Sequence, residues 1–345
     1  MAPSTRSRSK SLIKSHSSSS SVEKRSNDDN GSKRKNNNNS SSNSSGGSSS
    51  NNSNKKRKHN NNEVTNTNTT VTHREENMNN ETIIINKIII PHVQNQLQRK
   101  SNPIKAKQMQ KYIKNEIMPM YGINKSDRVI VEKSIYQVLQ DRCNITKKND
   151  RMTQELYKYL IKRLWNLSHR EEKYLAIDVA LYYKNCITYE MVPIYESMLR
   201  ETYMWWDLCD PIATNIIGKI TLDNPIKMKS ILYKWINDNH DNDNDDNDND
   251  HDNDDDDITK NKNIWIRRTA ILSQLKHKEH MDTTMLYDFC TICCKEKEFF
   301  LRKAIGWILR EYSKTNPKSV QTYLLQNKTK LSKLSYKEGS KYLLK

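Results

Sequence analysis

Two tryptophans and two aspartates lie within nine residues of this chain, in the stretch TYMWWDLCD from Thr202 to Asp210. Tryptophan is otherwise scarce, with six in 345 residues. An electron-rich indole face attracts cations, and a nearby carboxylate stabilises positive charge that develops in a reaction. If the stretch is helical, Trp206 and Asp210 are four residues apart and share one face. The two residues are therefore a candidate site for chemistry on a positively charged group.

Spacing alone also allows a structural interpretation, and on spacing alone that interpretation is favoured. A helix here places Trp205 in an apolar stripe with Leu208, Cys209, Ile212 and Ile216. The stripe explains Trp205 as a core residue but leaves Trp206 and Asp210 unexplained. Trp206 could pack under a neighbouring helix, and Asp210 could cap one. Because Pro211 follows directly, either Asp210 lies near the N-terminus of its helix or the helix kinks there.

Helices must position these residues, because apolar side chains recur at three- and four-residue spacing from about residue 103 onward. We predict helices over 103–119, 126–140, 151–166, 169–184, 188–201, 205–220, 224–237, 263–276, 282–294, 297–313 and 316–327, then a short one to the end. Antiparallel helix pairs of this length, joined by short turns, predict an all-α fold of the α-solenoid type.

Composition divides the chain near residue 90. Residues 1–89 are rich in Ser, Asn, Lys and Arg and poor in apolar side chains, which predicts a disordered, low-complexity tail. Residues 90–345 are long enough for one domain with its own core. An Asp/Asn-rich run within 237–262 separates two predicted helices, and we interpret it as a disordered insertion. Its aspartates are interpreted as solvated low complexity rather than as a calcium site.

The net charge of +17 is unevenly distributed. Residues 1–101 hold 17 basic and 7 acidic side chains, whereas 237–257 hold 12 Asp and no Lys or Arg, which leaves +19 for the rest. A folded part this basic suggests a polyanionic partner. A merely lysine-rich, solvated surface remains the alternative.

The cysteines and histidines raise the question of a metal site. His277 and His280, followed by Cys290, Cys293 and Cys294, have spacings compatible with zinc. The segment FCTICC nevertheless lies on an apolar helix face, where cysteine is a common core residue, so we predict core cysteines and no metal. The sequence shows no secretory signal before the predicted helices. It also has no run of 18 apolar residues, which a membrane-spanning helix would need. We therefore expect an intracellular, reduced protein without a membrane partner.

Several segments, together with WWDLCD, resemble a known family. They are NPIKAKQMQKYIKN (102–115), NIWIRRTAILSQLKHK (263–278), KEFFLRKAIGWILREYSKTNP (297–317) and LSKLSYKEGSKYL (331–343). On these segments, residues from about 90 to 345 resemble the AlkD-type DNA alkylation repair glycosylases. The segment at 297–317 is the most specific of them. The resemblance implies a solenoid of HEAT-like helical repeats, with the acidic run as an insertion.

The resemblance also implies roles for individual residues. The family's catalytic Asp falls on Asp210, and its two active-site tryptophans fall on Trp206 and Trp307. The family's DNA-binding positions fall on Arg268, Tyr112 and Lys276. No metal and no cofactor is implied.

The implied function is a DNA glycosylase that hydrolyses the N-glycosidic bond of cationic N3- or N7-alkylated purines in duplex DNA, without a base-flipping pocket. Cleavage of such a bond develops oxocarbenium character on the sugar, which a carboxylate stabilises. No lysine stands out as a Schiff-base nucleophile, so we expect a monofunctional enzyme, acting as a monomer. The alternative is a non-catalytic HEAT-like scaffold that binds nucleic acid or protein.

Two features of the tail bear on location. The basic clusters at 33–35 and 55–58 resemble nuclear import signals, which favours the nucleus. The first twenty residues are rich in Arg and Ser and free of acidic residues, as transit peptides are, which keeps the mitochondrion as an alternative beside the cytoplasm.

Overall fold

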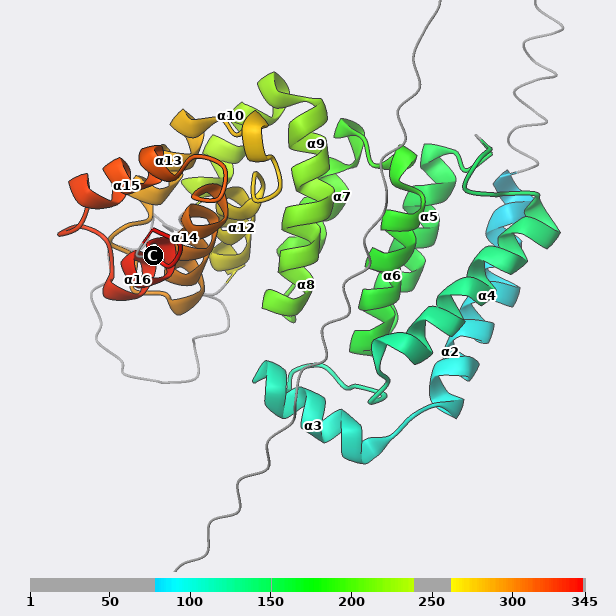
Figure 1. Cartoon of the computed structure of the whole chain (residues 1–345). Coiled ribbons are helices and arrows are strands. Elements are labelled where there is room, and N and C mark those ends of the chain that lie inside the picture. Colours follow the sequence, from blue (N-terminus) through cyan, green and yellow to red (C-terminus); the bar gives the residue numbers. More distant parts are fainter. Residues whose placement is uncertain (1–77, 150, 239–261, 344–345) are drawn as a thin grey trace, which may run out of the picture. The chain divides into compact units, whose positions relative to one another are not determined.

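The computed structural model describes residues 78–149, 151–238 and 262–343. The chain divides into two compact units, Met1–His59 and Asn60–Lys345, and every described residue belongs to the second. Within the described residues the regular secondary structure is helical throughout, as predicted (Figure 1). The predicted disordered tail falls mostly on residues before 78, and the predicted insertion mostly on 239–261, both outside the described residues.

The helices have the following bounds: α2 (Ile90–Arg99), α3 (Pro103–Ile113), α4 (Lys125–Cys143), α5 (Gln154–Trp165), α6 (Arg170–Tyr182), α7 (Val192–Leu199), α8 (Trp206–Pro211), α9 (Gly218–Asp223), α10 (Pro225–Ile236), α12 (Lys262–Leu272), α13 (Thr283–Ile292), α14 (Phe299–Tyr312), α15 (Pro317–Gln326) and α16 (Lys333–Gly339). Short π-helices are η1 (Ile85–Ile89) and η4 (Ile212–Ile217), and short 3₁₀ segments are η2 (Lys184–Cys186), η3 (Tyr189–Met191) and η6 (Lys278–His280).

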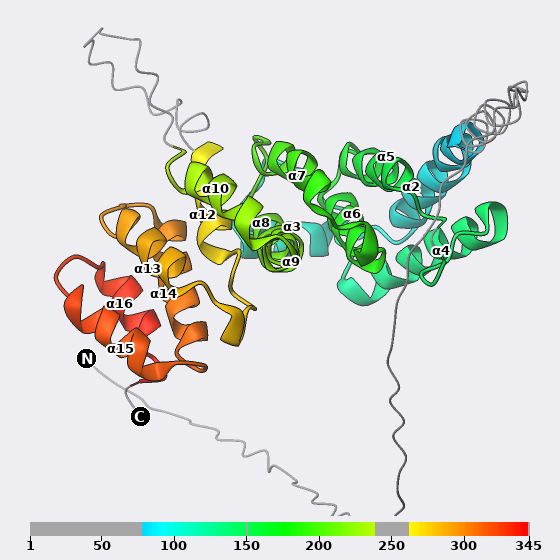
Figure 2. The same ribbon diagram turned by 90° about the horizontal axis from the view of Figure 1, so that it is seen from above.

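The helices stack in succession along the chain. A row is formed by α6, α8, α12, α14 and α16, each of which packs against the next (Figures 1 and 2). Other helices flank this row: α5 packs on α6, α10 and α13 pack on α12, and α15 packs on both α14 and α16. Contacts between neighbours in sequence are what an α-solenoid requires, so the predicted fold class is confirmed.

The N-terminal boundary differs from the prediction. Residues 78–89 were assigned to the tail, yet they are helical and continue into α2. Ile85 and Ile89 are 0 and 1 % exposed and belong to the main hydrophobic core. The apolar run IIINKIII (83–90) explains the difference, because burying it offsets the entropy of ordering this segment.

The helix predicted over 103–119 also ends early, at Ile113. Lys114 adopts a left-handed conformation with φ of 56°, and its N–H donates to the carbonyl of Gln110, which closes the helix. The following segment turns back toward α6. The early end leaves the carbonyl of Ile113 free to accept other donors.

The first turn of α6 buries four consecutive charged residues. Arg170, Glu171, Glu172 and Lys173 are each 2 % exposed or less. A buried charge is costly unless it is paired or hydrogen-bonded. All four side chains are hydrogen-bonded, and Arg170 is also ion-paired with Asp207. Arg170 bonds α8, and the Nζ of Lys173 donates to the carbonyls of Trp165 and Leu167, at the end of α5 and just beyond it. This turn therefore connects α6 to the elements on either side.

Glu171 holds the segment between α3 and α4. Its carboxylate accepts the backbone N–H groups of Tyr121, Gly122 and Ile123 at 3.0, 2.8 and 3.1 Å. Glu172 accepts the Tyr121 hydroxyl at 3.0 Å. Gly122 has φ of +81°, and a Cβ there would lie 2.2 Å from the carbonyl oxygen of Asn102. The turn that presents three N–H groups to one carboxylate therefore requires glycine.

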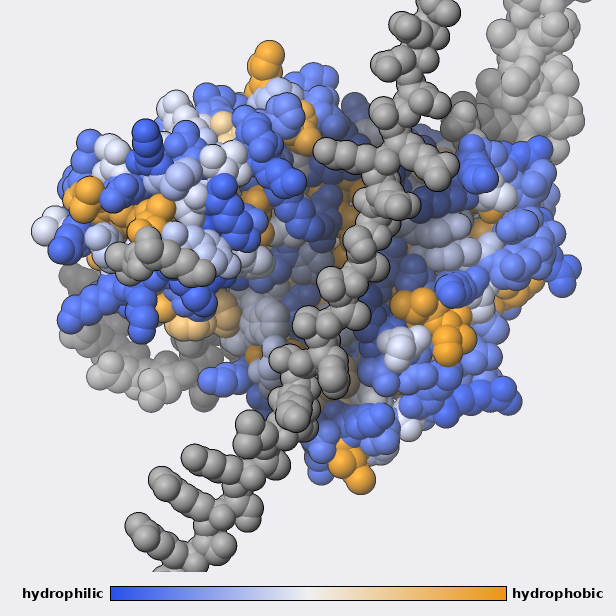
Figure 3. All heavy atoms as spheres, viewed as in Figure 1, coloured by the Kyte–Doolittle hydropathy of each residue, from blue (hydrophilic) through white to orange (hydrophobic). Residues whose placement is uncertain are grey.

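The surface of the described residues is mainly hydrophilic. On the face shown in Figure 3, apolar side chains occur in small, separate groups. In the part of the chain that the structure describes, no helix has both the length and the apolar character needed to cross a bilayer.

The Gly122 turn yields a stability prediction. Gly122→Ala forces a left-handed alanine against backbone atoms, so we expect the free energy of unfolding to fall by about 2 kcal/mol or more. Gly339→Ala is the control, because its added Cβ would meet only leucine side chains, the nearest atom at 3.2 Å. The control should change stability by less than about 1 kcal/mol. Urea denaturation measures both, and equal losses would contradict the role given to Gly122.

Candidate active site

Two adjacent tryptophans mark the start of α8 and are held by the end of α3. Trp205 is the N-cap residue, in an extended conformation, and α8 begins at Trp206. The indole N–H of Trp205 donates to the carbonyl of Ile113 at 2.7 Å, and that of Trp206 reaches the same oxygen at 3.4 Å. The Trp205 ring also packs on Trp265 and Phe300, with centroids 5.3 and 5.0 Å away. Trp205 therefore has a packing role, as predicted.

Two carboxylates on one turn of α8 are each paired with an arginine from a different neighbouring helix. Asp207 accepts two hydrogen bonds from Arg170 of α6, at 2.7 and 2.6 Å. Asp210 accepts two from Arg268 of α12, at 2.7 and 2.9 Å. Such bidentate pairs fix the orientation of both side chains. The two aspartates thus pair with different neighbouring helices, although a separation of three residues leaves them only about 60° apart around the axis of α8.

Asp210 is the more accessible of the two carboxylates. Its side chain is 17 % exposed, against 9 % for Asp207, which also accepts the hydroxyl of Tyr174. Burial raises the pKa of Asp210 above its usual value, while the Arg268 guanidinium opposes that rise and the charge of Asp207 adds to it. Asp210 is therefore a fixed, partly desolvated carboxylate with a surface open to solvent, whereas Asp207 is saturated by protein donors.

Pro211 does not end the helix. It has φ of −66° and ψ of −35°, and the chain continues through the π-helix η4 into α9. Proline supplies no N–H, and the wider π turn accommodates that loss within a continuous helix. Asp210 is therefore the fifth residue of α8 rather than a residue at the helix N-terminus. The hydroxyl of Thr214 donates to its carbonyl at 2.8 Å.

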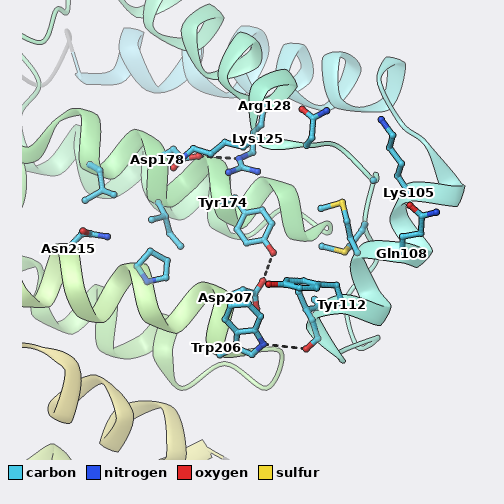
Figure 4. A pocket seen from close by; sticks show the side chains of 18 residues that line it. Lys105, Gln108, Tyr112, Lys125, Arg128, Tyr174, Asp178, Trp206, Asp207 and Asn215 are labelled. Carbon is cyan, nitrogen blue, oxygen red and sulfur yellow. Dashed lines mark hydrogen bonds and ion pairs between the residues drawn. The ribbon is translucent and has the colours of Figure 1, made fainter. Parts of the chain in front are cut away.

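A cleft of about 680 Å³ opens beside Trp206, between α3, α6, α8 and the start of α4 (Figure 4). Tyr112 of α3 lies at this cleft with 76 % of its surface exposed, and its ring meets Trp206 edge-on at 6.2 Å. Tyr174 and Asp207 line the cleft as well, together with Lys105, Gln108, Lys125, Arg128, Asp178 and Asn215. The lining does not include Asp210, which lies one turn along α8 on the side of α12.

The structure joins four of the six predicted site residues in two contacting pairs. Tyr112 contacts Trp206, and Arg268 contacts Asp210. The Nζ of Lys276 donates to Asn215, which lines the cleft. Trp307 is half-buried in α14, seven residues after Phe300 and so on the same helix face.

Arg268 has a more structural environment than a DNA contact would suggest. Its side chain is 5 % exposed, and besides Asp210 it bonds the carbonyl of Phe300 at 2.6 Å. Its direct effect in this structure is to orient the Asp210 carboxylate against α14. Contact between Arg268 and DNA stays a prediction.

Sequence reasoning missed Arg170 and Tyr174, the two partners that hold Asp207. Arg170 lies in a run of charged residues at a helix start, a pattern typical of an exposed first turn. No signal in the sequence separates a buried charged turn from an exposed one, because the pairing partners lie 37 and 33 residues away.

The cysteines are core residues, as predicted. Cys290 and Cys293 are fully buried, Cys294 is 8 % exposed, and His277 bonds the carbonyl of Gly218 at 2.9 Å. Among the described residues there is no group of three or more His, Cys, Asp or Glu that could hold a metal ion.

Comparison with known proteins defines the class of protein. The sequence matches the family model described as DNA alkylation repair enzyme over residues 93–242 and 246–343, and the chain belongs to this family. It is also similar to a solved structure described as a predicted DNA alkylation repair enzyme from Enterococcus faecalis, at 26 % identity and a TM-score of 0.56. That similarity covers 71 % of this chain and 98 % of the other. Comparison with curated proteins gave no match.

The Asp207–Arg170 pair yields a second stability prediction. Asp207→Asn leaves the guanidinium of a fully buried arginine without a counter-charge, so we expect a loss of about 3 kcal/mol in unfolding free energy. Asp223→Asn is the matched control, because Asp223 is 47 % exposed in its pair with Lys219 and should cost less than about 1 kcal/mol. Chemical denaturation of both variants measures the change in unfolding free energy. If Asp207→Asn loses no more unfolding free energy than Asp223→Asn, the Asp207–Arg170 pair does not hold α6 to α8.

Proposed function

We propose that this chain is a DNA glycosylase that hydrolyses the N-glycosidic bond of N3- or N7-alkylated purines in duplex DNA. The observation that carries the proposal is the Asp210 carboxylate, fixed by two hydrogen bonds from Arg268 and open to solvent one turn from Trp206. Membership of the DNA alkylation repair enzyme family supports it.

The chemistry suits these groups. An alkylated purine carries a positive charge that weakens its bond to the sugar. As the bond between C1′ and N9 breaks, its electron pair moves to the purine and neutralises that charge, while positive charge develops on the deoxyribose. A water oxygen then bonds to C1′ and releases one proton. Asp210 stabilises the positive sugar and orients the water, and burial strengthens this interaction because the local dielectric is low.

Aromatic side chains complete the proposed site. Trp206 offers an indole face near Asp210, where it can pack on the sugar or on the cationic base. Tyr112 extends this aromatic surface on the cleft side, and Trp307 is proposed to contribute from α14. Asp210 lies outside the cleft lining, so a sugar can reach the carboxylate without the base entering that cavity. This geometry supports excision without a base-flipping pocket.

The environment of Lys173 does not suit a Schiff-base nucleophile, which agrees with a monofunctional hydrolase. Burial lowers the pKa of this lysine to about 8, a change that could favour a nucleophilic amine. Its Nζ is nevertheless engaged by two carbonyl oxygens, and the residue is 2 % exposed. We therefore assign Lys173 to the packing of α6 on α5 and not to Schiff-base chemistry.

The proposal makes a direct prediction about Asp210. Asp210→Asn should keep fold and DNA binding but lose base release by about 10²- to 10³-fold, because the amide cannot stabilise the developing charge. Trp206→Ala should lose less, since it removes contact area but no charge. Single-turnover release of 7-methylguanine from duplex DNA measures both.

Asp178→Asn is the matched control for that assay. Asp178 is also paired with an arginine, Arg128 at 3.1 Å, and lines the neighbouring cleft. Its change should leave release within a few fold of the unaltered chain. Full activity in Asp210→Asn would overturn the assignment of the carboxylate.

The pH dependence of release provides a further test. Release requires ionised Asp210, so the rate should fall as pH drops through a pKa raised above the usual aspartate value. Arg268 lowers this pKa, so Arg268→Gln should move the acid limb of the profile to higher pH, whereas Arg268→Lys should move it less. The measurement is the single-turnover rate against pH, corrected for loss of base without enzyme. An unchanged limb in Arg268→Gln would show that Asp210 does not govern it.

A further inference from the structure

A second pocket, of about 730 Å³, lies at the opposite end of α6 from Arg170. It is formed by the chain before α5, the first residues of α5, the end of α6 and η2. Along the axis of α6 its residue Tyr182 is about 18 Å from Arg170. The pocket is therefore separate from the Asp210 site.

The side chains of this pocket combine cations with an aromatic ring. Lys147, Lys148 and Lys184 line it, and all three are exposed. The ammonium of Lys147 lies over the ring of Tyr182, 4.9 Å from its centroid. Tyr182 is in turn stacked on Tyr136, with centroids 3.6 Å apart, so its ring is held in place.

The helix α5 begins at this pocket. Its N-cap Thr153 and its first residue Gln154 are among the lining residues, and the Thr153 hydroxyl accepts the N–H of Leu156 at 3.2 Å. A helix N-terminus carries partial positive charge, which adds to that of the lysines. Glu155 is the acidic member of the described lining.

The pocket wall also contains a buried tyrosine, Tyr183. It lines the same pocket and is 5 % exposed, and its hydroxyl has no hydrogen-bond partner among the described residues.

We propose that this pocket binds a nucleotide, with the phosphate on the three lysines and the base on the Tyr182 ring. Every base has a face that stacks on an aromatic ring, and lysines bind phosphate as point charges. The base would replace the Lys147 ammonium over Tyr182, and that ammonium would then contact the phosphate. The nucleotide belongs either to the DNA strand held at the Asp210 site, which rests on the proposed function, or to a free mononucleotide.

The test compares the unaltered chain with the double variant Lys147→Ala/Lys184→Ala. The matched control is Lys227→Ala, because Lys227 also lies over a tyrosine ring, that of Tyr189 at 5.0 Å, but not at this pocket. The probes are dAMP, a short duplex that spans only the Asp210 site, and a longer duplex extended on both sides. Affinities are measured by calorimetry for dAMP and by fluorescence anisotropy at several salt concentrations for DNA.

Two results support the proposal and separate its sources. If the strand supplies the nucleotide, the double variant binds the longer duplex roughly tenfold more weakly, with a salt slope smaller by about one or two, and binds the short duplex unchanged. If the ligand is a free nucleotide, the unaltered chain binds dAMP, the double variant does not, and duplex affinities are equal.

The proposal is overturned if dAMP does not bind and both duplexes bind the double variant as they bind the unaltered chain. It is also overturned if Lys227→Ala has the same effects as the double variant. None of the three probes measures base release. If nucleotide binding fails while base release persists, this pocket proposal fails and the proposed function stands. If base release fails while nucleotide binding persists, the proposed function fails and the pocket proposal stands.

Discussion

The structure depends on two carboxylates that share one turn of α8 and are bound to different helices. Asp207 connects α8 to α6 through Arg170, and Asp210 connects it to α12 through Arg268. Each pair desolvates two charges, a cost that only good geometry and further hydrogen bonds offset. Tyr174 provides such a bond to Asp207, and the carbonyl of Phe300 provides one to Arg268. The orientation of α8, and with it that of Trp206, therefore follows from charges that cannot rotate away without losing their partners.

The same constraint extends in both directions along the stack. On one side, the buried turn of α6 holds the segment before α4 through Glu171, and that segment places α3 so that the Ile113 carbonyl meets both tryptophans. On the other side, Arg268 bonds α14, which is linked to α16 by Lys303 and Arg310 on Glu338. Polar links between successive helices thus accompany the hydrophobic core and define the register in which they stack.

Much of this organisation could be predicted from sequence, and the limits have physical causes. Helical periodicity located nearly every helix after residue 103, and it placed Trp206 and Asp210 on the same helix, α8. Local patterns could not predict that α3 ends at Ile113, that η4 follows Pro211, or that Arg170 and its neighbours are buried. The burial of Arg170 and its neighbours depends on partners distant in sequence, such as Tyr121, which lies 50 residues from Glu171. The end of α3 depends on the left-handed conformation of Lys114, which its residue type does not reveal. Residues 78–89 were assigned to the tail because the apolar run IIINKIII follows directly on a polar, low-complexity stretch.

The central claim is that the Asp210 carboxylate stabilises positive charge on the sugar. The most direct measurement compares the affinity of the protein for two duplexes, one with a cationic aza-sugar in place of the damaged nucleoside and one with a neutral tetrahydrofuran abasic analogue. A site complementary to an oxocarbenium-like transition state should prefer the cationic duplex by on the order of 100-fold, and Asp210→Asn should abolish that preference while keeping affinity for the neutral duplex. Equal affinity for both duplexes, or a preference that survives in Asp210→Asn, would contradict the account.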